Sequence, residues 1–169
     1  MVKQASQRVP GTPLKVEQGM AAYAVPPPSG GAAKAWVVYR NQFLNAPAEA
    51  QISEIRKGAP ASNLAGAAEA LRLPRERIYE LVGLSAATAK RKLARNDTLD
   101  PLVTERLTRL GAIEKLAEDT FGDPAMAAQW LQAANAGLGN AAPLSMLDTE
   151  IGCREVARIL NAIAYGGAA

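Results

Sequence analysis

The chain has 169 residues, enough for one or two small domains; 49% are hydrophobic but only 5% are aromatic, so alanine and aliphatic side chains must build the core. Such an alanine-rich composition favours an all-α fold. The net charge of +3 divides into +4 for residues 1–46, −1 for 47–71, +4 for 72–109 and −4 for 110–169, which indicates two surfaces with different partners. The absence of histidine and of phosphate-binding glycine motifs excludes histidine-based nucleophile pairs and histidine metal sites, so we expect no catalysis, no cofactor and no metal.

Residues 1–33 contain little that could fold alone, and the run VPPPSGG at 25–31 joins a stiff polyproline piece to a flexible one. We expect a tail, or alternatively an arm whose basic side chains lie on DNA or on a partner. The segment lacks the apolar run of a signal peptide, and no stretch of the chain is apolar enough to cross a membrane. A single cysteine permits no internal disulfide, which fits a cytoplasmic protein.

Residues 34–46 contain three of the eight aromatic residues. The run from Trp36 to Tyr39 favours a strand by propensity, whereas the spacing of Val38, Phe43 and Leu44 allows a helix, so both alternatives stay open. We expect this segment to form a packing patch, either within the chain or between subunits. Residues 1–46 are therefore interpreted as an irregular N-terminal arm or a dimerisation segment.

Two short helices are predicted next. Residues 47–57 begin with a proline, place basic side chains in the last turn and stop at Gly58. Residues 61–72 have apolar positions at helical spacing, and either Ser62 or Asn63 can cap that helix.

Residues 74–95 carry the pattern of a helix-turn-helix. Pro74 starts a short helix, Gly83 permits the left-handed backbone of a tight turn, and Ser85 caps a second helix over 86–95. Between residues 85 and 95 there are four basic side chains and no acidic one, which suits the phosphate backbone of DNA. The alternative is an ordinary helical hairpin with a solvated basic face.

The second helix supplies the candidate DNA contacts. Thr88 can bond a phosphate, the fork of Arg91 matches the two acceptors on the major-groove edge of guanine, and Ala87 is short enough to touch a thymine methyl. The full set of predicted DNA-binding residues is Ser85, Ala87, Thr88, Lys90, Arg91, Lys92 and Arg95.

The remaining chain predicts one long helix followed by a helix, a loop and a last helix. Helical spacing runs through 99–121, with Arg106 and Arg109 expected on the outer face as an extension of the basic surface. Asp123 starts the next helix, and glycines and prolines then make a loop. Either Asp148 or Thr149 caps the last helix, whose inner stripe is Gly152, Val156, Ile159, Leu160 and Ile163.

The order of residues from about 52 to 166 resembles the antitoxins of the Xre/MbcA/ParS type from bacterial type II toxin–antitoxin pairs. The resemblance covers about two thirds of the chain, and single markers are weak while the set is specific. Its markers are Gly58, Gly83-Leu84-Ser85, Thr88, Arg91, Leu99, Glu105-Arg106-Leu107, Arg109, Trp130-Leu131, Asn135, Leu138-Gly139, Pro143-Leu144, Leu147-Asp148-Thr149, Gly152 and Tyr165-Gly166. One departure is Ala87, where many members carry arginine.

The resemblance implies a division of labour. Residues 47–109 would form a helix-turn-helix domain that dimerises and binds the operator of its own operon, and residues 110–169 a domain that binds a toxin. The toxin would be of the RES type, which consumes NAD⁺ by hydrolysis or by ADP-ribosylation, and the antitoxin would cover the entrance of its active site. The implied toxin contacts are Glu150, Arg154, Arg158, Asn161, Tyr165 and Gly166, while Trp130, Leu131, Leu144, Leu147, Val156 and Cys153 are expected in the core.

Two alternatives to an antitoxin stay open. The first is a stand-alone transcription regulator whose C-terminal domain only dimerises. The second is an interaction protein with a relict helix-turn-helix, which predicts no salt-dependent binding to its own promoter.

Overall fold

The computed structural model describes residues 30–166; residues 1–29 and 167–169, and with them most of the tail predicted over 1–33, lie outside the described part. All regular structure within the described range is helical, apart from an isolated bridge between Pro60 and Thr98, which confirms the all-α prediction. The α-helices are α1 (Gly31–Asn45), α2 (Ala48–Lys57), α3 (Ser62–Ala70), α4 (Arg75–Leu81), α5 (Ala86–Arg95), α6 (Pro101–Phe121), α7 (Pro124–Gln132) and α8 (Glu150–Ala164), and two short 3-10 helices are η1 (Ala136–Leu138) and η2 (Pro143–Met146).

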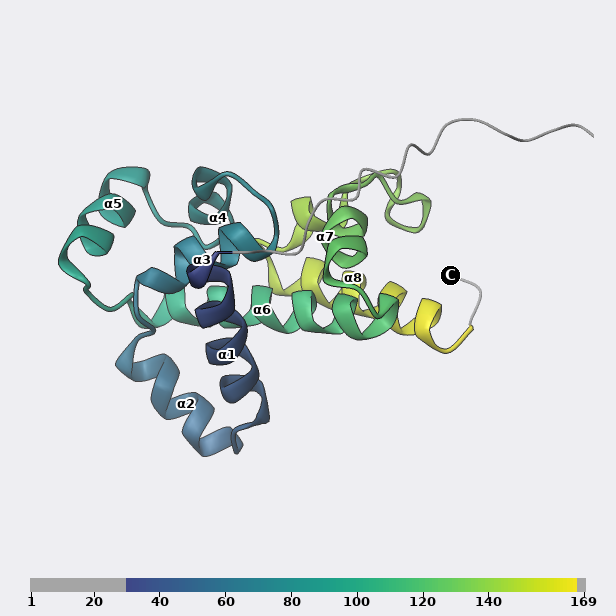
Figure 1. The fold of residues 1–169 in the computed structure, drawn as a ribbon. Helices are drawn as coiled ribbons and strands as arrows, with labels where there is room; N and C mark the ends of the chain where they lie inside the picture. Colours follow the sequence, from purple (N-terminus) through teal and green to yellow (C-terminus); the bar gives the residue numbers. More distant parts are fainter. Residues whose placement is uncertain (1–29, 167–169) are drawn as a thin grey trace, which may run out of the picture.

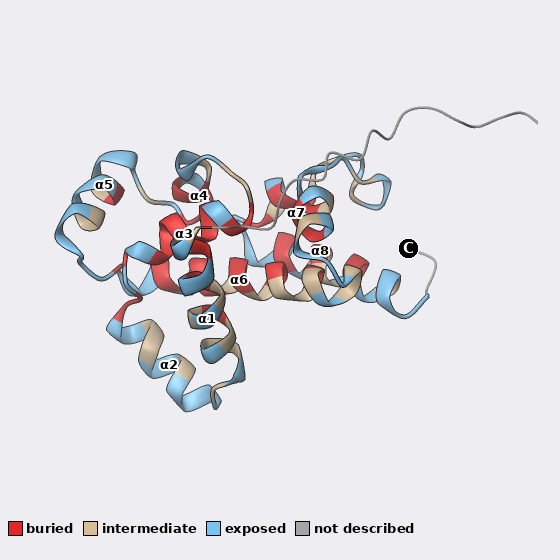
Figure 2. Ribbon diagram, viewed as in Figure 1, coloured by how far each residue is buried: buried red, intermediate tan, exposed pale blue. Residues whose placement is uncertain are grey.

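The long helix α6 is the common support of the molecule (Figure 1). It has 21 residues, which gives a length of about 30 Å. Helices α2 to α5 lie toward the N-terminal end of α6, whereas α1 crosses α6 at its middle and reaches Glu114 and Glu118 beyond it. Helices α7 and α8 also pack along α6. Buried residues concentrate in α3 and along the side of α6 that meets the other helices (Figure 2). The boundary predicted between residues 109 and 110 therefore falls inside one continuous helix.

Of the strand and the helix left open for residues 34–46, the structure has the helix, α1. It packs mainly against α3 and also contacts α6. Trp36 and Arg40 are buried at its inner face, where the Trp36 indole Nε1 donates to Glu114 Oε2 over 2.7 Å. The guanidinium of Arg40 donates to both carboxylate oxygens of Glu118, over 3.0 and 2.7 Å, and lies 3.1 Å from Glu114 Oε1. Burial of these groups thus overrides the strand propensity of the run from 36 to 39.

The prediction that Ser62 or Asn63 caps α3 was wrong. The N-cap is Ala61, which has no side-chain cap. Ala61 is buried, and its backbone N–H donates to the carbonyl of Asp97 over 3.0 Å. Because the core and this tertiary hydrogen bond fix the start of the helix, a polar cap is not needed there.

The C-terminal helices begin where the sequence predicts. The Asp123 carboxylate accepts from the backbone N–H of Ala125 and of Met126, and the hydroxyl of Thr149, rather than Asp148, accepts from Gly152 N over 3.0 Å. A Cβ on Gly152 would lie 1.9 Å from the carbonyl oxygen of Met146, so this glycine allows η2 to approach α8 closely. No helix in the described range is both long and apolar enough to span a bilayer.

Candidate functional surfaces

The turn between α4 and α5 has the backbone that a helix-turn-helix requires. Gly83 adopts a φ of +70°, in the left-handed region that favours glycine. The Ser85 hydroxyl accepts from the backbone N–H of Thr88 over 3.2 Å and donates to the Thr88 hydroxyl over 2.9 Å. Ala89 is fully buried and seats α5 on the core. The predicted cap and turn are therefore present, and they fix the orientation of α5.

The outer face of α5 is cationic and accessible. Lys90, Arg91 and Arg95 are exposed and form no ion pair within the described residues. Ala87 and Ser85 are exposed beside them, while Thr88 is half-buried. Cations without acidic partners retain their full charge toward an anion, so this face is suited to phosphate.

Lys92 is used differently from the other predicted DNA contacts. Its side chain is only 15% exposed, and its ammonium donates to the carbonyl of Thr98 over 2.8 Å and lies 3.7 Å from Asp100 Oδ1. It therefore fixes the loop that follows α5, on the inner side of that helix.

The expectation that Arg106 and Arg109 extend the basic surface was wrong. Arg106 is half-buried, and its Nη1 donates to the carbonyl of Val82 over 3.3 Å, directly behind the turn. Arg109 has a side chain only 22% exposed, and its Nη1 lies 3.2 Å from Glu105 Oε1. Arg106 therefore joins α6 to the turn after α4, whereas Arg109 pairs with a carboxylate one turn earlier on α6 itself.

Helix α8 has one buried face and one exposed face. Its inner stripe consists of Gly152, Cys153, Val156, Ile159 and Leu160, all buried. The predicted inner residue Ile163 is instead 41% exposed, because it lies in the last turn, beyond the region covered by α6.

The six predicted partner contacts all lie on the exposed side or at the free end of α8, and all of them are exposed. Arg154 lies 3.7 Å from Glu150, Arg158 donates to Glu155 over 3.0 Å, and Tyr165 is 86% exposed. These ion pairs are open to solvent and contribute little to stability, so the arginines can exchange their partners at low cost.

Sequence reasoning missed one residue of this face. Ile151 is 69% exposed and lies one turn before Arg154 and two before Arg158. Its signal is in the sequence: it precedes two arginines at spacings of three and seven, away from the buried stripe. Ile151 therefore adds apolar area to the outer face of α8, next to the arginines of its first turns.

Cys153 has the packing role expected of it. It is buried, its Sγ lies 3.6 Å from the carbonyl oxygen of Leu147, and burial raises the pKa of its thiol. Within the described residues no group of three or more cysteine, aspartate or glutamate side chains could hold a metal ion.

Both halves of the chain match family models. Residues 50–111 match the Antitoxin Xre-like helix-turn-helix domain, and residues 116–166 match the Antitoxin Xre/MbcA/ParS C-terminal toxin-binding domain. A protein of Sphingobium sp. (strain YBL2), named Prs ADP-ribosylating antitoxin, is 30% identical over 137 residues that cover 76% of this chain and 86% of the relative. The chain belongs to the Xre/MbcA/ParS family of antitoxins.

Two further relatives are both named Antitoxin Xre. The protein of Yersinia enterocolitica serotype O:8 is 28% identical over 95 residues, which cover 56% of this chain and 64% of the relative. The protein of Photorhabdus laumondii is 31% identical over 90 residues, which cover 53% of this chain and 61% of the relative. The antitoxin thus carries α5 in the domain matched to helix-turn-helix proteins and α8 in the toxin-binding domain, while α1 precedes both matched ranges.

Proposed function

We propose that this antitoxin neutralises a RES-type, NAD⁺-consuming toxin by laying the outer face of α8 over the entrance of the toxin's active site. The observation that carries the proposal is the division of α8: one stripe is sealed in the core, and the opposite side has no partner within the described chain apart from its own solvent-exposed ion pairs. Tyrosine and arginine supply most of the binding energy in protein interfaces, and α8 presents Tyr165, Arg154 and Arg158 on this side.

The neutralisation test uses surface variants of α8. A double variant, Arg158→Ala with Tyr165→Ala, is co-expressed with the product of the adjacent gene. We expect loss of the stable complex, falling cellular NAD⁺ and growth arrest, whereas the wild type protects. The matched control is Arg77→Ala, which removes a partly exposed arginine from an i,i+3 pair with Glu80 on α4. Full protection by the double variant, with an intact complex, would exclude this face as the toxin contact.

The two chemistries of NAD⁺ consumption give different products. Hydrolysis leaves free ADP-ribose, whereas ADP-ribosylation transfers the ADP-ribose to a protein. The name of the Sphingobium relative contains ADP-ribosylation, which favours the second chemistry for the toxin of this antitoxin. To distinguish them, adenine-labelled NAD⁺ is incubated with the toxin and a lysate, with and without the antitoxin. A labelled protein band that the antitoxin suppresses supports transfer, whereas label found only in free ADP-ribose contradicts it.

We also propose that the antitoxin acts as a homodimer that represses its own operon through α5. The exposed cations Lys90, Arg91 and Arg95 and the correctly built turn support operator binding. Arg91→Ala is expected to weaken binding to the chain's own promoter in fluorescence anisotropy, with Arg154→Ala on α8, which removes an exposed arginine outside the helix-turn-helix, as the control. Equal retention of promoter DNA by the Arg91 variant and the wild type would instead favour the relict helix-turn-helix.

The alternative of a stand-alone regulator, in which the C-terminal domain only dimerises, needs point variants rather than a truncation. Removing the chain beyond Ala141 would take away α8 and uncover the apolar side of α6, so loss of DNA binding would follow from misfolding under either reading. The Arg158/Tyr165 double variant avoids this, since both residues are exposed. If it loses promoter binding as well as dimerisation, the regulator reading is correct.

A further inference from the structure

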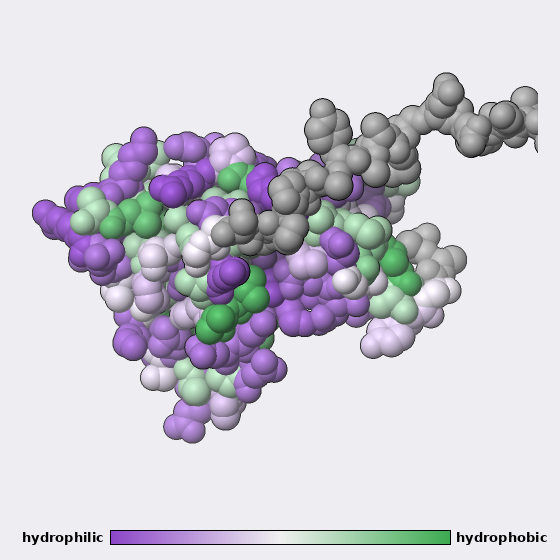
Figure 3. All heavy atoms as spheres, in the orientation of Figure 1, coloured by the Kyte–Doolittle hydropathy of each residue, from purple (hydrophilic) through white to green (hydrophobic). Residues whose placement is uncertain are grey.

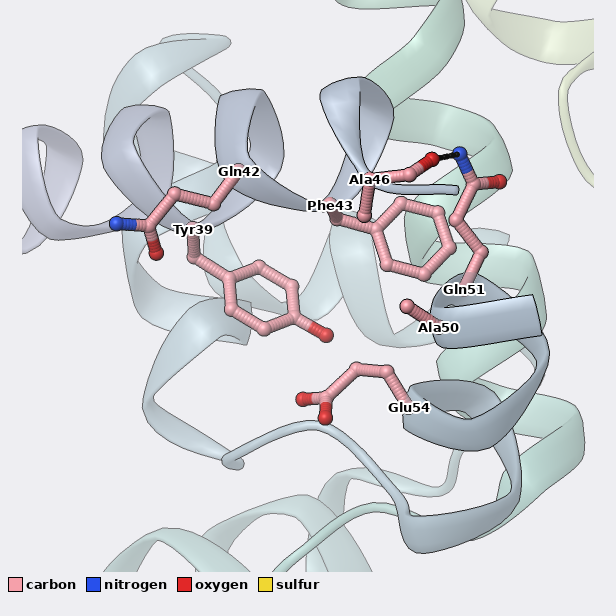
Figure 4. Close-up of a pocket in the computed structure, with 7 residues that line it drawn as sticks. All are labelled: Tyr39, Gln42, Phe43, Ala46, Ala50, Gln51 and Glu54. Carbon is pink, nitrogen blue, oxygen red and sulfur yellow. Dashed lines mark hydrogen bonds between the residues drawn. The ribbon is translucent and has the colours of Figure 1, made fainter. Parts of the chain in front are cut away.

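A hollow of about 290 Å³ opens between α1 and α2, on a part of the molecule that neither proposed surface uses (Figure 4). Tyr39 and Phe43 line one side, with ring centroids 6.5 Å apart, and Ala50 lies opposite them on α2. The Tyr39 hydroxyl is buried beside the Glu54 carboxylate without a hydrogen bond of good geometry, and this burial together with the charge of Glu54 raises its pKa. The hollow therefore combines aromatic walls, an unsatisfied hydroxyl and a carboxylate.

The two helices that form the hollow are poorly covered by the rest of the chain. Helix α2 has ten residues and none of them is buried. Isolated helices of this length are marginal in water, and helices in proteins are stabilised mainly by packing of their apolar face. On α1, Val38 is 56% exposed one turn before Gln42, which lines the hollow, and hydrophobic side chains gather over α1 in the space-filling view (Figure 3).

The charges at the rim are self-complementary. Glu54 and Lys57 lie one turn apart on α2, and the Lys57 ammonium is 3.9 Å from Glu54 Oε2 with its side chain 75% exposed. When two copies of a helix pack antiparallel about a two-fold axis, a residue i of one copy meets j of the other and j meets i. An acid and a base one turn apart then form two equivalent pairs, Glu54 with Lys57 of the second copy and the reverse.

We propose that the α1–α2 face is the surface through which two copies of this antitoxin associate, with α2 packed antiparallel to α2 and Lys57 of each copy entering the hollow of the other. The ammonium meets Glu54 and the Tyr39 hydroxyl, and its aliphatic stem covers the ring of Phe43. This assignment rests on the homodimer proposed above and names its surface. In Figure 1, α2 lies on the side of the molecule away from α5 and far from the free end of α8, so the association leaves both surfaces open.

The test uses two charge reversals: each alone is expected to weaken the dimer, and the two mixed together are expected to restore it. Glu54→Lys gives a chain with two lysines at these positions, and Lys57→Glu gives one with two glutamates. Each variant by itself faces like charges across the axis, so its dimer dissociation constant in analytical ultracentrifugation is expected to rise about tenfold or more. An equimolar mixture is expected to form a heterodimer at the wild-type affinity, because both cross-axis pairs are restored.

The mixture excludes a trivial explanation, since each single variant has already lost the pair within its own helix and only contact between chains can restore it. The matched control is Glu80→Lys mixed with Arg77→Glu, which reverses an exposed i,i+3 pair on α4 with similar charge changes. If the variants dimerise with the same dissociation constant as the wild type, the dimer forms through another surface, and only this proposal is overturned. A wild type that stays monomeric across the micromolar range overturns the homodimer too, and toxin neutralisation is scored separately.

Discussion

The buried carboxylate of Glu114 gives the sharpest stability prediction. It lies in the core between α1 and α6, where Trp36 donates to it over 2.7 Å and Arg40 lies 3.1 Å away. Arg40 also binds Glu118 through both carboxylate oxygens, so two carboxylates share one cation. Burial raises the pKa of Glu114 to about 7, and the favourable contacts with Arg40 and Trp36 offset only part of that effect.

The sign follows from proton linkage. Between pH 4.5 and about 7, Glu114 is protonated in the folded protein but ionised in the unfolded chain, whose carboxyl has a pKa of 4.5. Stability from this group is therefore complete below pH 4.5 and is lost as the pH rises toward and through 7. A rise in pKa from 4.5 to about 7 corresponds to about 3–4 kcal/mol at most, at about 1.4 kcal/mol for each pH unit.

Glu114→Gln removes the charge while keeping an oxygen for the Trp36 indole, and it leaves Arg40 paired with Glu118. We expect the variant and the wild type to have similar stability near pH 5, and the variant to gain up to about 3 kcal/mol near pH 8, or roughly 6–12 °C in melting temperature. Thermal melts across this range test the difference, with the exposed Glu105→Gln as the control. A difference that is constant with pH, or that grows toward low pH, would refute the account of Glu114 as a strained buried acid.

Three further outcomes are expected. Gly83→Ala should lower the free energy of unfolding by about 1–2 kcal/mol in a urea titration, because Gly83 has a positive φ and the new Cβ would lie 2.0 Å from Arg106 Nη1. The control Gly31→Ala, which has open space around it, should not destabilise the protein. The Cys153 thiol, buried and with a raised pKa, should react with a disulfide reagent only as fast as the protein opens, and at once in denaturant; rapid reaction of the native protein would contradict the packing. Operator affinity should fall with salt at a slope of about −2.7 per protomer on a double-logarithmic plot, from three exposed cations on α5. Lys90→Ala should reduce that slope by about 1, and an unchanged slope would remove Lys90 from the phosphate contacts.

The helices after residue 47 could be predicted because their starts and stops are local. A left-handed glycine at 58, 83 or 122 ends or separates helices, and Ser85 and Asp123 cap the helices that follow them. Each of these signals acts within three or four residues, so it can be read without knowing the fold.

Helix α1 could not be predicted in this way, because the groups that hold it lie far along the chain. Trp36 and Arg40 find their carboxylates 78 residues away on α6. A strand at 36–39 would also need a neighbouring strand to satisfy its backbone, and the described chain offers none. The inward roles of Lys92 and Arg106 have the same origin, since their acceptors are backbone carbonyls that only the folded chain brings near.

Both surfaces are attached to one helix, and this decides how they can work together. Arg106 of α6 holds the carbonyl of Val82 at the helix-turn-helix, and one turn later Arg109 lies close enough to Cys153 of α8 for its charge to act on that thiol. The two attachments lie one turn apart on the same continuous helix, while α5 and the free end of α8 project to different sides of the molecule in Figure 1. If DNA binds α5 and a toxin binds the outer face of α8, as proposed above, the two contacts involve different surfaces and neither partner needs to displace the other.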